Sequence, residues 1–206
     1  MKKKPGHIII LPEVDSSNNY AIHLINSKIA VHGTIVMALC QSKGKGQRGN
    51  SWISEANKNL LASIILLPEF LAADKQFYLS KIASLAILSY LKKETSDVSV
   101  KWPNDIYCGN KKISGILIEN MVQGDSIYSS VVGIGLNLNQ MYFNDDIPNP
   151  VSLKILTGKE YIPEDVIEII NDNFFRYYEM LISGNVEIID KEYLDNIYLK
   201  NIWSKF

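Results

Sequence analysis

The chain has 206 residues, of which 47% are hydrophobic and 21% charged, and its formal net charge is -1. These values are typical of a single soluble globular domain and argue against a disordered, fibrous or membrane protein. The near balance of basic and acidic residues also argues against a nucleic-acid-binding surface over the whole molecule. Cys40 and Cys108 are too few for a disulfide framework and lack zinc-site spacing, so a reducing, cytoplasmic setting is favoured.

The first half of the chain predicts three strands and two helices. Residues 7–14 are short and β-branched, which favours a strand, and the polar residues of "DSSNNY" then begin a helix that runs to about residue 28. Residues 34–40 and 59–67 predict two more strands, the second of which is ended by Pro68. Residues 75–93 are apolar nearly all round, which predicts a long helix buried against a sheet.

The second half begins with three predicted strands at residues 98–108, 111–121 and 126–139, at the short spacing of antiparallel pairing. Two helical patterns follow, and in the first of them Val166, Ile169, Ile170 and Phe174 recur at helical spacing. Clustered strands with segregated helices indicate an α+β fold.

A glycine-rich stretch at residues 41–52, "QSKGKGQRGNSW", is close to the phosphate-loop pattern, but Asn50 replaces its lysine. Three glycines allow close backbone approach, while Lys43, Lys45 and Arg48 supply cations. The stretch therefore predicts an anion site of another type. A solvated basic turn is the alternative.

A second stretch at residues 101–119, "KWPNDIYCGNKKISGILIE", combines lysines with one early carboxylate, Asp105. A hard cation prefers such oxygen ligands, and a polyphosphate needs lysines held on a rigid hairpin. Two amphipathic strands with exposed lysines are the alternative.

Together and in this order, the two stretches resemble the catalytic domain of the biotin protein ligases, whose motifs run G-R-G-R-R-G-R-x-W and then K-W-P-N-D-x-x...K-x-x-G-I-L-x-E. Here residues 44–52 match the first motif, and residues 101–105 and 112–119 match the second. Residues 16–18 resemble the family's serine-threonine-asparagine run, and residues 133–139 resemble its later glycine-asparagine strand. The resemblance covers about residues 7–140. It implies a class II synthetase-like biotin/lipoate ligase catalytic domain, with a mixed, largely antiparallel sheet flanked by helices.

The resemblance implies that biotin and ATP, with Mg²⁺, give biotinyl-5'-AMP, and that a lysine of a biotin carboxyl carrier protein or carrier domain then accepts the biotinyl group. Such chemistry needs charge neutralisation and alignment rather than a protein nucleophile. The expected catalytic residues are Lys112, Arg48, Asp105 and Lys101, with Asp105 as the metal ligand. The expected biotin-binding residues are Ser16, Ser17, Asn18, Gln41, Lys45, Gly46, Gln47, Trp52, Lys112 and Gly115. The expected ATP-binding residues are Lys45, Arg48, Asn104, Asp105, Lys112 and Asn137.

The loop departs from the family pattern at Lys45 and Gln47, which stand where the motif has arginines. Arg48 and Lys112, with backbone N–H groups, are therefore expected to hold the adenylate phosphate. Several features also have structural interpretations. Residues 16–18 could simply cap a helix, without binding a ligand. Trp52 and Trp102 could belong to the core, and Gly133 and Gly135 could simply permit close strand packing.

Two other functions within the same superfold are a lipoate or octanoate ligase or transferase and a biotin-binding relative without catalysis. A DNA-binding repressor is not expected, because the first strand begins near residue 7 and leaves no room for a helix-turn-helix domain. The tail at residues 192–206 resembles the helical segment that leads into the family's SH3-like barrel, and no strands follow it. We therefore expect residues 1–206 to form a single catalytic domain that binds no DNA or membrane, as a monomer or homodimer.

Overall fold

The computed structural model describes residues 7–145 and 147–200, and within this part seven strands form one sheet in the order β1-β2-β3-β7-β6-β5-β4. β1 and β2 are parallel, whereas every other neighbouring pair is antiparallel. The strands span Ile8–Leu11 (β1), Ile35–Ala38 (β2), Leu60–Leu66 (β3), Val98–Lys101 (β4), Asp105–Cys108 (β5), Lys111–Gln123 (β6) and Ser126–Leu136 (β7). The prediction of a mixed, largely antiparallel sheet is confirmed.

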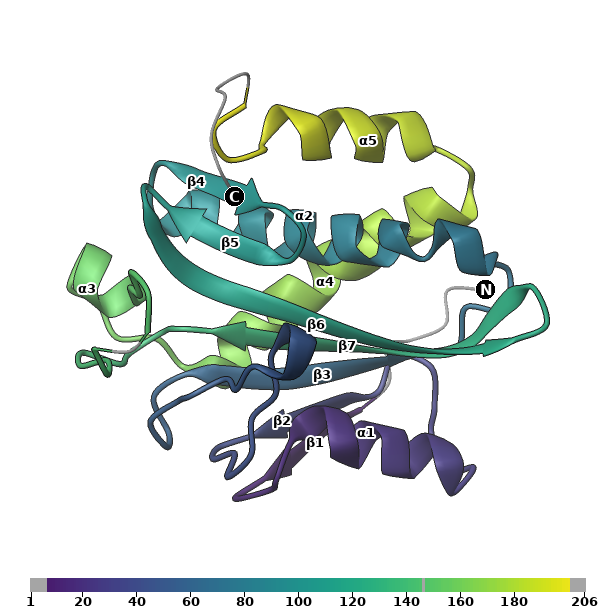
Figure 1. The fold of residues 1–206 in the computed structure, drawn as a ribbon, viewed down its shortest axis with the longest axis horizontal. Coiled ribbons are helices and arrows are strands. Elements are labelled where there is room, and N and C mark those ends of the chain that lie inside the picture. Colours follow the sequence, from purple (N-terminus) through teal and green to yellow (C-terminus); the bar gives the residue numbers. More distant parts are fainter. Residues whose placement is uncertain (1–6, 146, 201–206) are drawn as a thin grey trace.

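Helices cover both faces of this sheet unequally (Figure 1). One face carries α1, and the other carries the two long helices α2 and α4, beyond which α5 packs. The helices span Ser17–Asn26 (α1), Phe77–Glu94 (α2), Leu153–Thr157 (α3), Pro163–Ile182 (α4) and Val186–Asp195 (α5), with short 3-10 turns at Gln47–Gly49 and Ala73–Lys75. Among the described residues, no helix is long and apolar enough to cross a membrane.

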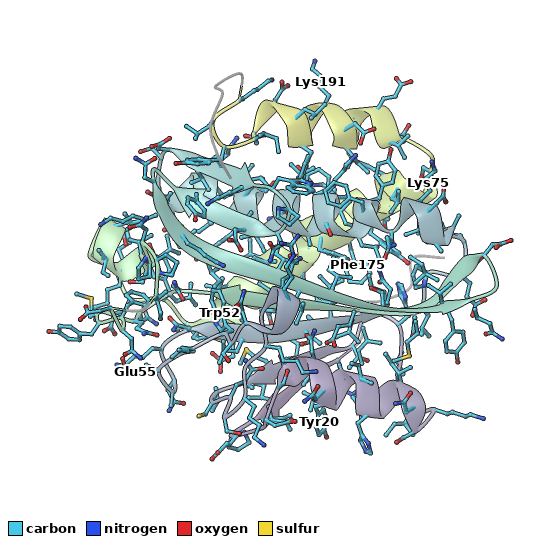
Figure 2. All side chains as sticks on the ribbon, in the orientation of Figure 1. Tyr20, Trp52, Glu55, Lys75, Phe175 and Lys191 are labelled. Atoms are coloured by element: carbon cyan, nitrogen blue, oxygen red, sulfur yellow. The ribbon has the colours of Figure 1, made fainter. Side chains whose placement is uncertain are left out.

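The two layers of apolar side chains differ in size. The larger core lies between the sheet and helices α2 and α4, whereas a small one lies beneath α1 and includes Ala21, Val36 and Val131. Figure 2 shows Tyr20 and Phe175 on opposite sides of the sheet, each beside one of these cores. The α1 face thus has less apolar cover, and it is on this face that the sheet remains open.

The structure corrects three sequence-based predictions in the second half. Residues 98–108 form two strands rather than one, because the chain reverses at residues 102–104, where Pro103 follows Trp102. The short helix α3 was missed, although Ser152 caps it by accepting a hydrogen bond from Ile155 N. Ile169, expected on the buried face of α4, is 41% exposed.

The predicted helical tail at residues 192–206 is confirmed only at its start. α5 ends at Asp195, and Ile197 then forms a parallel bridge with Val100 on the edge strand β4. Residues 201–206 lie outside the described part of the chain, as does the lysine run at residues 2–4. The short segment after α5 is therefore an extension of the sheet edge.

Candidate active site

A cavity of about 420 Å³ opens on the α1 face of the sheet. Its floor is a row of residues that are paired across five neighbouring strands. Lys101 on β4 pairs with Asp105 on β5, Asp105 pairs with Gly115 on β6, and Gly115 pairs with Gly135 on β7. Leu61 on β3 completes the row. Sequence-distant motifs therefore meet because antiparallel pairing aligns them.

The glycines of this floor make room for other side chains. A Cβ on Gly135 would lie 2.4 Å from Trp52 Cε2, and one on Gly115 would lie 2.8 Å from Trp52 Cζ3. A Cβ on Gly133 would lie 2.3 Å from Asn18 Oδ1. Real Cβ contacts are not this short, so the glycines accommodate the Trp52 ring and the Asn18 amide, and strand packing alone does not explain them.

The glycine-rich loop forms a small hairpin over the floor. Trp52 N donates to Gly44 O at 2.9 Å, and Gly46 N donates to Asn50 O at 2.7 Å. Arg48 adopts a left-handed conformation with φ 55°, and Gly49 follows with φ 81°. Trp52 is half-buried at the base of this hairpin, so the loop lies against the sheet through its aromatic ring.

Neutral polar groups gather at the end of the cavity near α1. Ser16, Ser17 and Asn18 are at most 4% exposed. Ser17 N donates to Gln41 Oε1 at 2.6 Å, which leaves the NH₂ group as the donor end of the Gln41 amide. Ser16 is the N-cap residue of α1 but forms no side-chain cap hydrogen bond. The helix-capping interpretation therefore fails for Ser16.

Asp15 instead contacts two residues at the start of α1. Its carboxylate accepts hydrogen bonds from Asn19 Nδ2 at 2.6 Å and from Ser16 N at 2.7 Å. The Asn19 hydrogen bond is the main cause that lowers the pKa of Asp15; burial opposes it, and the Ser16 N–H and nearby Lys45 lower the pKa further. The carboxylate therefore stays charged at the base of the polar end.

A lysine-carboxylate pair lies at the other end, where β5 and β6 meet. Lys112 Nζ is 2.7 Å from Asp105 Oδ1, and the two side chains are 27% and 20% exposed. Asp105 Oδ1 nevertheless lacks a well-oriented hydrogen bond, so the contact is mainly one of charge. Lys112 Nζ also lies 5.6 Å from the centre of the Trp52 ring.

A β-bulge brings Lys112 to this position. β5 pairs Ile106 with Ser114 but Tyr107 with Lys112, so Ile113 has no opposite residue. Side chains alternate between faces along a regular strand, and three positions separate Lys112 from Gly115. The extra residue shifts Lys112 to the cavity face, while Ile113 is buried in the opposite core. Lys111 does not line the cavity.

Lys101 and Asn104 are both braced by neighbouring groups. Lys101 Nζ donates to Tyr107 Oη at 3.1 Å and lies 4.7 Å from the centre of that ring. Asn104 Nδ2 donates to Ile116 O at 3.0 Å, which fixes the turn between β4 and β5 against β6. The ends of both side chains are therefore held at the edge of the cavity.

The predicted site residues lie together with one exception. Asn137 does not line the cavity: it is 4% exposed, and its Nδ2 donates to Val151 O at 3.0 Å. Its amide ties the segment before α3 to β7, so the arrangement does not support the predicted ATP contact. The predicted residues that do line the cavity are Ser16, Ser17, Asn18, Gln41, Lys45, Gly46, Gln47, Arg48, Trp52, Lys101, Asn104, Asp105, Lys112 and Gly115.

Sequence reasoning missed several residues around the cavity. The apolar side chain of Leu61 lines its floor, and Trp102, which could have been a core residue, is 59% exposed at its edge. Glu119 lies behind the loop, with Oε1 3.6 Å from Lys45 Nζ. Glu119 ends a motif that the sequence displays, but only the fold reveals its partners.

A divalent cation would find little protein ligation here. Asp105 is the one carboxylate among the residues that line the cavity, and the described residues contain no group of three His, Cys, Asp or Glu suited to a metal. Mg²⁺ is commonly held by one or two carboxylates together with substrate phosphates. Asp105 fits that pattern, since phosphates would supply the remaining ligands.

Known proteins are similar to this chain in both sequence and fold. The model of the biotin/lipoate A/B protein ligase family matches residues 11–137. The bifunctional ligase/repressor BirA of Bacillus spizizenii is 32% identical over 145 residues, which are 70% of this chain and 44% of that protein. A biotin--[acetyl-CoA-carboxylase] ligase of Paracoccus denitrificans is 28% identical over 179 residues, which are 84% of this chain and 73% of that protein.

Among solved structures, the biotin protein ligase from Aquifex aeolicus in complex with biotin and ATP superposes with a TM-score of 0.79 at 27% identity, over 95% of this chain and 79% of that one. The matched part of the chain spans less than half the length of the Bacillus relative. Because the family model covers most of the chain, including both cavity motifs, the chain belongs to the biotin/lipoate A/B protein ligase family.

Proposed function

We propose that this chain activates biotin with ATP and transfers it to a lysine of a biotin carrier domain. In the first step a carboxylate oxygen of biotin bonds to the α-phosphorus of ATP, and pyrophosphate leaves. In the second step the lysine amine bonds to the acyl carbon of biotinyl-5'-AMP, loses a proton and displaces AMP. Both steps need alignment and charge stabilisation, and neither needs a protein nucleophile.

One observation carries this proposal. A single cavity joins neutral hydrogen-bonding groups near α1 to four cationic side chains, Lys45, Arg48, Lys101 and Lys112, with Trp52 and the glycine floor between them. Biotin has the matching order of a urea ring, an apolar body and a carboxylate. The Aquifex aeolicus relative was solved in complex with biotin and ATP, which supports the same two ligands for this cavity.

Each part of the cavity receives a role in the proposal. Ser17 and Gln41 bind the urea, and the Trp52 ring covers the apolar body. Lys45, Arg48 and Lys112 neutralise the phosphate at which charge develops. Asp105 would hold Mg²⁺, which supplies further charge neutralisation to the phosphates when bound.

The polar end favours biotin over lipoate or octanoate. A dithiolane or an alkyl chain has neither N–H nor C=O groups, so it would leave the cavity-facing lone pair of the buried Ser17 hydroxyl and the NH₂ group of Gln41 without a ligand partner. An unsatisfied buried polar group costs about 1–3 kcal/mol. Cys40 and Cys108 are free thiols, which are typical of a reducing compartment, and the proposed reaction uses ATP. We therefore propose that the reaction takes place in the cytoplasm.

The test is to incubate the protein with ATP, a carrier domain and either biotin or lipoate, and to weigh the carrier by mass spectrometry. We expect the biotinyl mass increase alone. Modification by lipoate instead would establish the other ligase. Biotin binding without pyrophosphate release would identify a non-catalytic relative.

A further inference from the structure

Behind the polar end of the cavity lies a chain of hydrogen bonds that the sequence motifs do not include. Its central member is Ser63 on β3, which is fully buried and does not line the cavity. Ser63 Oγ lies 2.6 Å from Asn18 Oδ1 and 2.7 Å from Ser17 Oγ. Ser63 thus joins two residues of the cavity wall from beneath.

The orientation of the Asn18 amide is determined by its other partners. Asn18 Nδ2 lies 2.8 Å from Glu119 Oε2 and 3.3 Å from Leu117 O. A backbone carbonyl oxygen only accepts hydrogen bonds, so the NH₂ group of Asn18 must face β6. Its Oδ1, which only accepts, must then face Ser63.

The direction of the remaining hydrogen bonds follows. Two oxygen atoms 2.6 Å apart need a hydrogen between them, and Asn18 Oδ1 has none to give, so the Ser63 hydroxyl donates its single hydrogen to Asn18. The short contact between Ser63 and Ser17 then requires the hydrogen of Ser17. Ser17 donates inward, and its remaining lone pair is directed to the cavity that it lines.

We propose that Ser63 is a positioning residue that holds the Ser17 hydroxyl as a hydrogen-bond acceptor, so that the site selects a ligand carrying an N–H at this point. With biotin as the ligand, as proposed above, the donor is a ureido N–H. The Gln41 amide supplies the complementary donor. Gln41 Oε1 already accepts a hydrogen bond from Ser17 N, so the Gln41 NH₂ group is left to donate to the ureido oxygen.

The direct test is neutron diffraction from a deuterium-exchanged crystal of the unliganded protein. We expect the Ser17 deuterium on the line to Ser63 Oγ and the Ser63 deuterium on the line to Asn18 Oδ1. A Ser63 deuterium directed at Ser17 would overturn the proposal. This outcome does not depend on which ligand the protein uses.

The functional test pairs a protein change with a ligand change. For the wild-type protein, replacing the relevant ureido N–H of biotin by oxygen, as in the two isomeric carbamate analogues, should weaken binding of one isomer about 10- to 100-fold. In Ser63→Ala the same replacement should cost less than about threefold, because Ser17 can then rotate and donate. Isothermal titration calorimetry measures both ratios.

The matched control is Ser130→Ala, which removes an equally buried hydroxyl that has no partner among the described residues. This control should retain the wild-type ratio. A purely structural role of Ser63 would weaken biotin and its analogues equally, leave the ratio unchanged and overturn the proposal. Failure of the wild-type protein to bind biotin would instead reject the proposed function, while the neutron result would still decide the direction of the Ser17 hydroxyl.

Discussion

The two ends of the cavity use different physical means to hold a ligand. Near α1, Ser17 and Asn18 are 4% exposed and are linked by directed hydrogen bonds to the fully buried Ser63. At the β5–β6 end, Lys112 and Asp105 remain 27% and 20% exposed and are held mainly by charge. A neutral group is recognised only when donors and acceptors are correctly oriented, whereas an anion is attracted from many directions. The neutral end therefore relies on buried, directed hydrogen bonds, and the Lys112–Asp105 pair relies on charge.

The largest effect should come from Lys112→Ala, which removes the cation nearest Asp105. We expect biotin-dependent pyrophosphate release to slow about 30- to 1,000-fold, which corresponds to roughly 2–4 kcal/mol of transition-state stabilisation. Lys111→Ala is the control, because the adjacent lysine is exposed and does not line the cavity. A greater loss for the Lys111 variant would show that the wrong lysine has been assigned.

The middle of the cavity connects the two ends, and Gly135→Ala should disrupt it. The new Cβ would lie 2.4 Å from Trp52 Cε2, so we expect a loss of roughly 1–3 kcal/mol in unfolding free energy and at least about tenfold in biotin affinity. Denaturant titration and calorimetry measure the two losses.

A double-mutant cycle identifies the cause of this loss. In a Trp52→Ala background the Gly135→Ala change should cost much less, since the clashing ring is absent. If Gly135→Ala caused equal losses in both backgrounds, the glycine would be needed for the conformation of the strand and not for contact with the Trp52 ring.

Salt dependence should separate the two ends. Arg48 is exposed on the loop, so Arg48→Gln should weaken ATP binding about three- to tenfold at low ionic strength and progressively less as salt screens the charge. Lys43→Gln, a loop lysine that does not line the cavity, is the matched control. The loss of biotin affinity in Ser17→Ala should be nearly independent of salt. A parallel salt dependence for Ser17→Ala would remove the distinction between the two ends.

The smallest effect concerns acid stability at the neutral end. The pKa of Asp15 is lowered in the folded protein from its usual 3.8, so its carboxylate stabilises the fold above about pH 4, and that contribution is lost as the pH falls through the lowered value. Asp15→Asn should therefore lower the free energy of unfolding slightly at neutral pH and make its decline below pH 4 shallower. Glu13→Gln removes the same charge two residues away. An equal change in that control would indicate a general effect of net charge.

Much of the fold was predictable because local sequence patterns determine local structure. The β-branched run before Pro12 and the all-round apolar segment of α2 place these elements within a few residues of their observed bounds. The sequence predicts one strand over residues 98–108, since apolar residues continue on both sides of Pro103, whereas the structure has two. Periodicity indicates which residues are buried, but it does not indicate where the chain reverses direction between two strands.

In the candidate site, too, local sequence patterns identified the residue types, and the tertiary structure determined their contacts. The sequence alone determined which motifs carry polar and charged groups, and nearly all of their predicted residues line one cavity. Asn137 belongs to such a motif, yet its amide is used to hold the chain at Val151, a contact that no local pattern encodes.

Tertiary structure alone decided how these groups are oriented. Ser63 lies in an apolar run and resembles any small core residue, but strand pairing places it opposite Gly133, beneath Asn18 and Ser17. The bulge at Ile113 likewise turns Lys112 toward Asp105. Hydrogen-bond direction and side-chain facing depend on partners far away in the chain, and the sequence brings those partners together only when the sheet has formed.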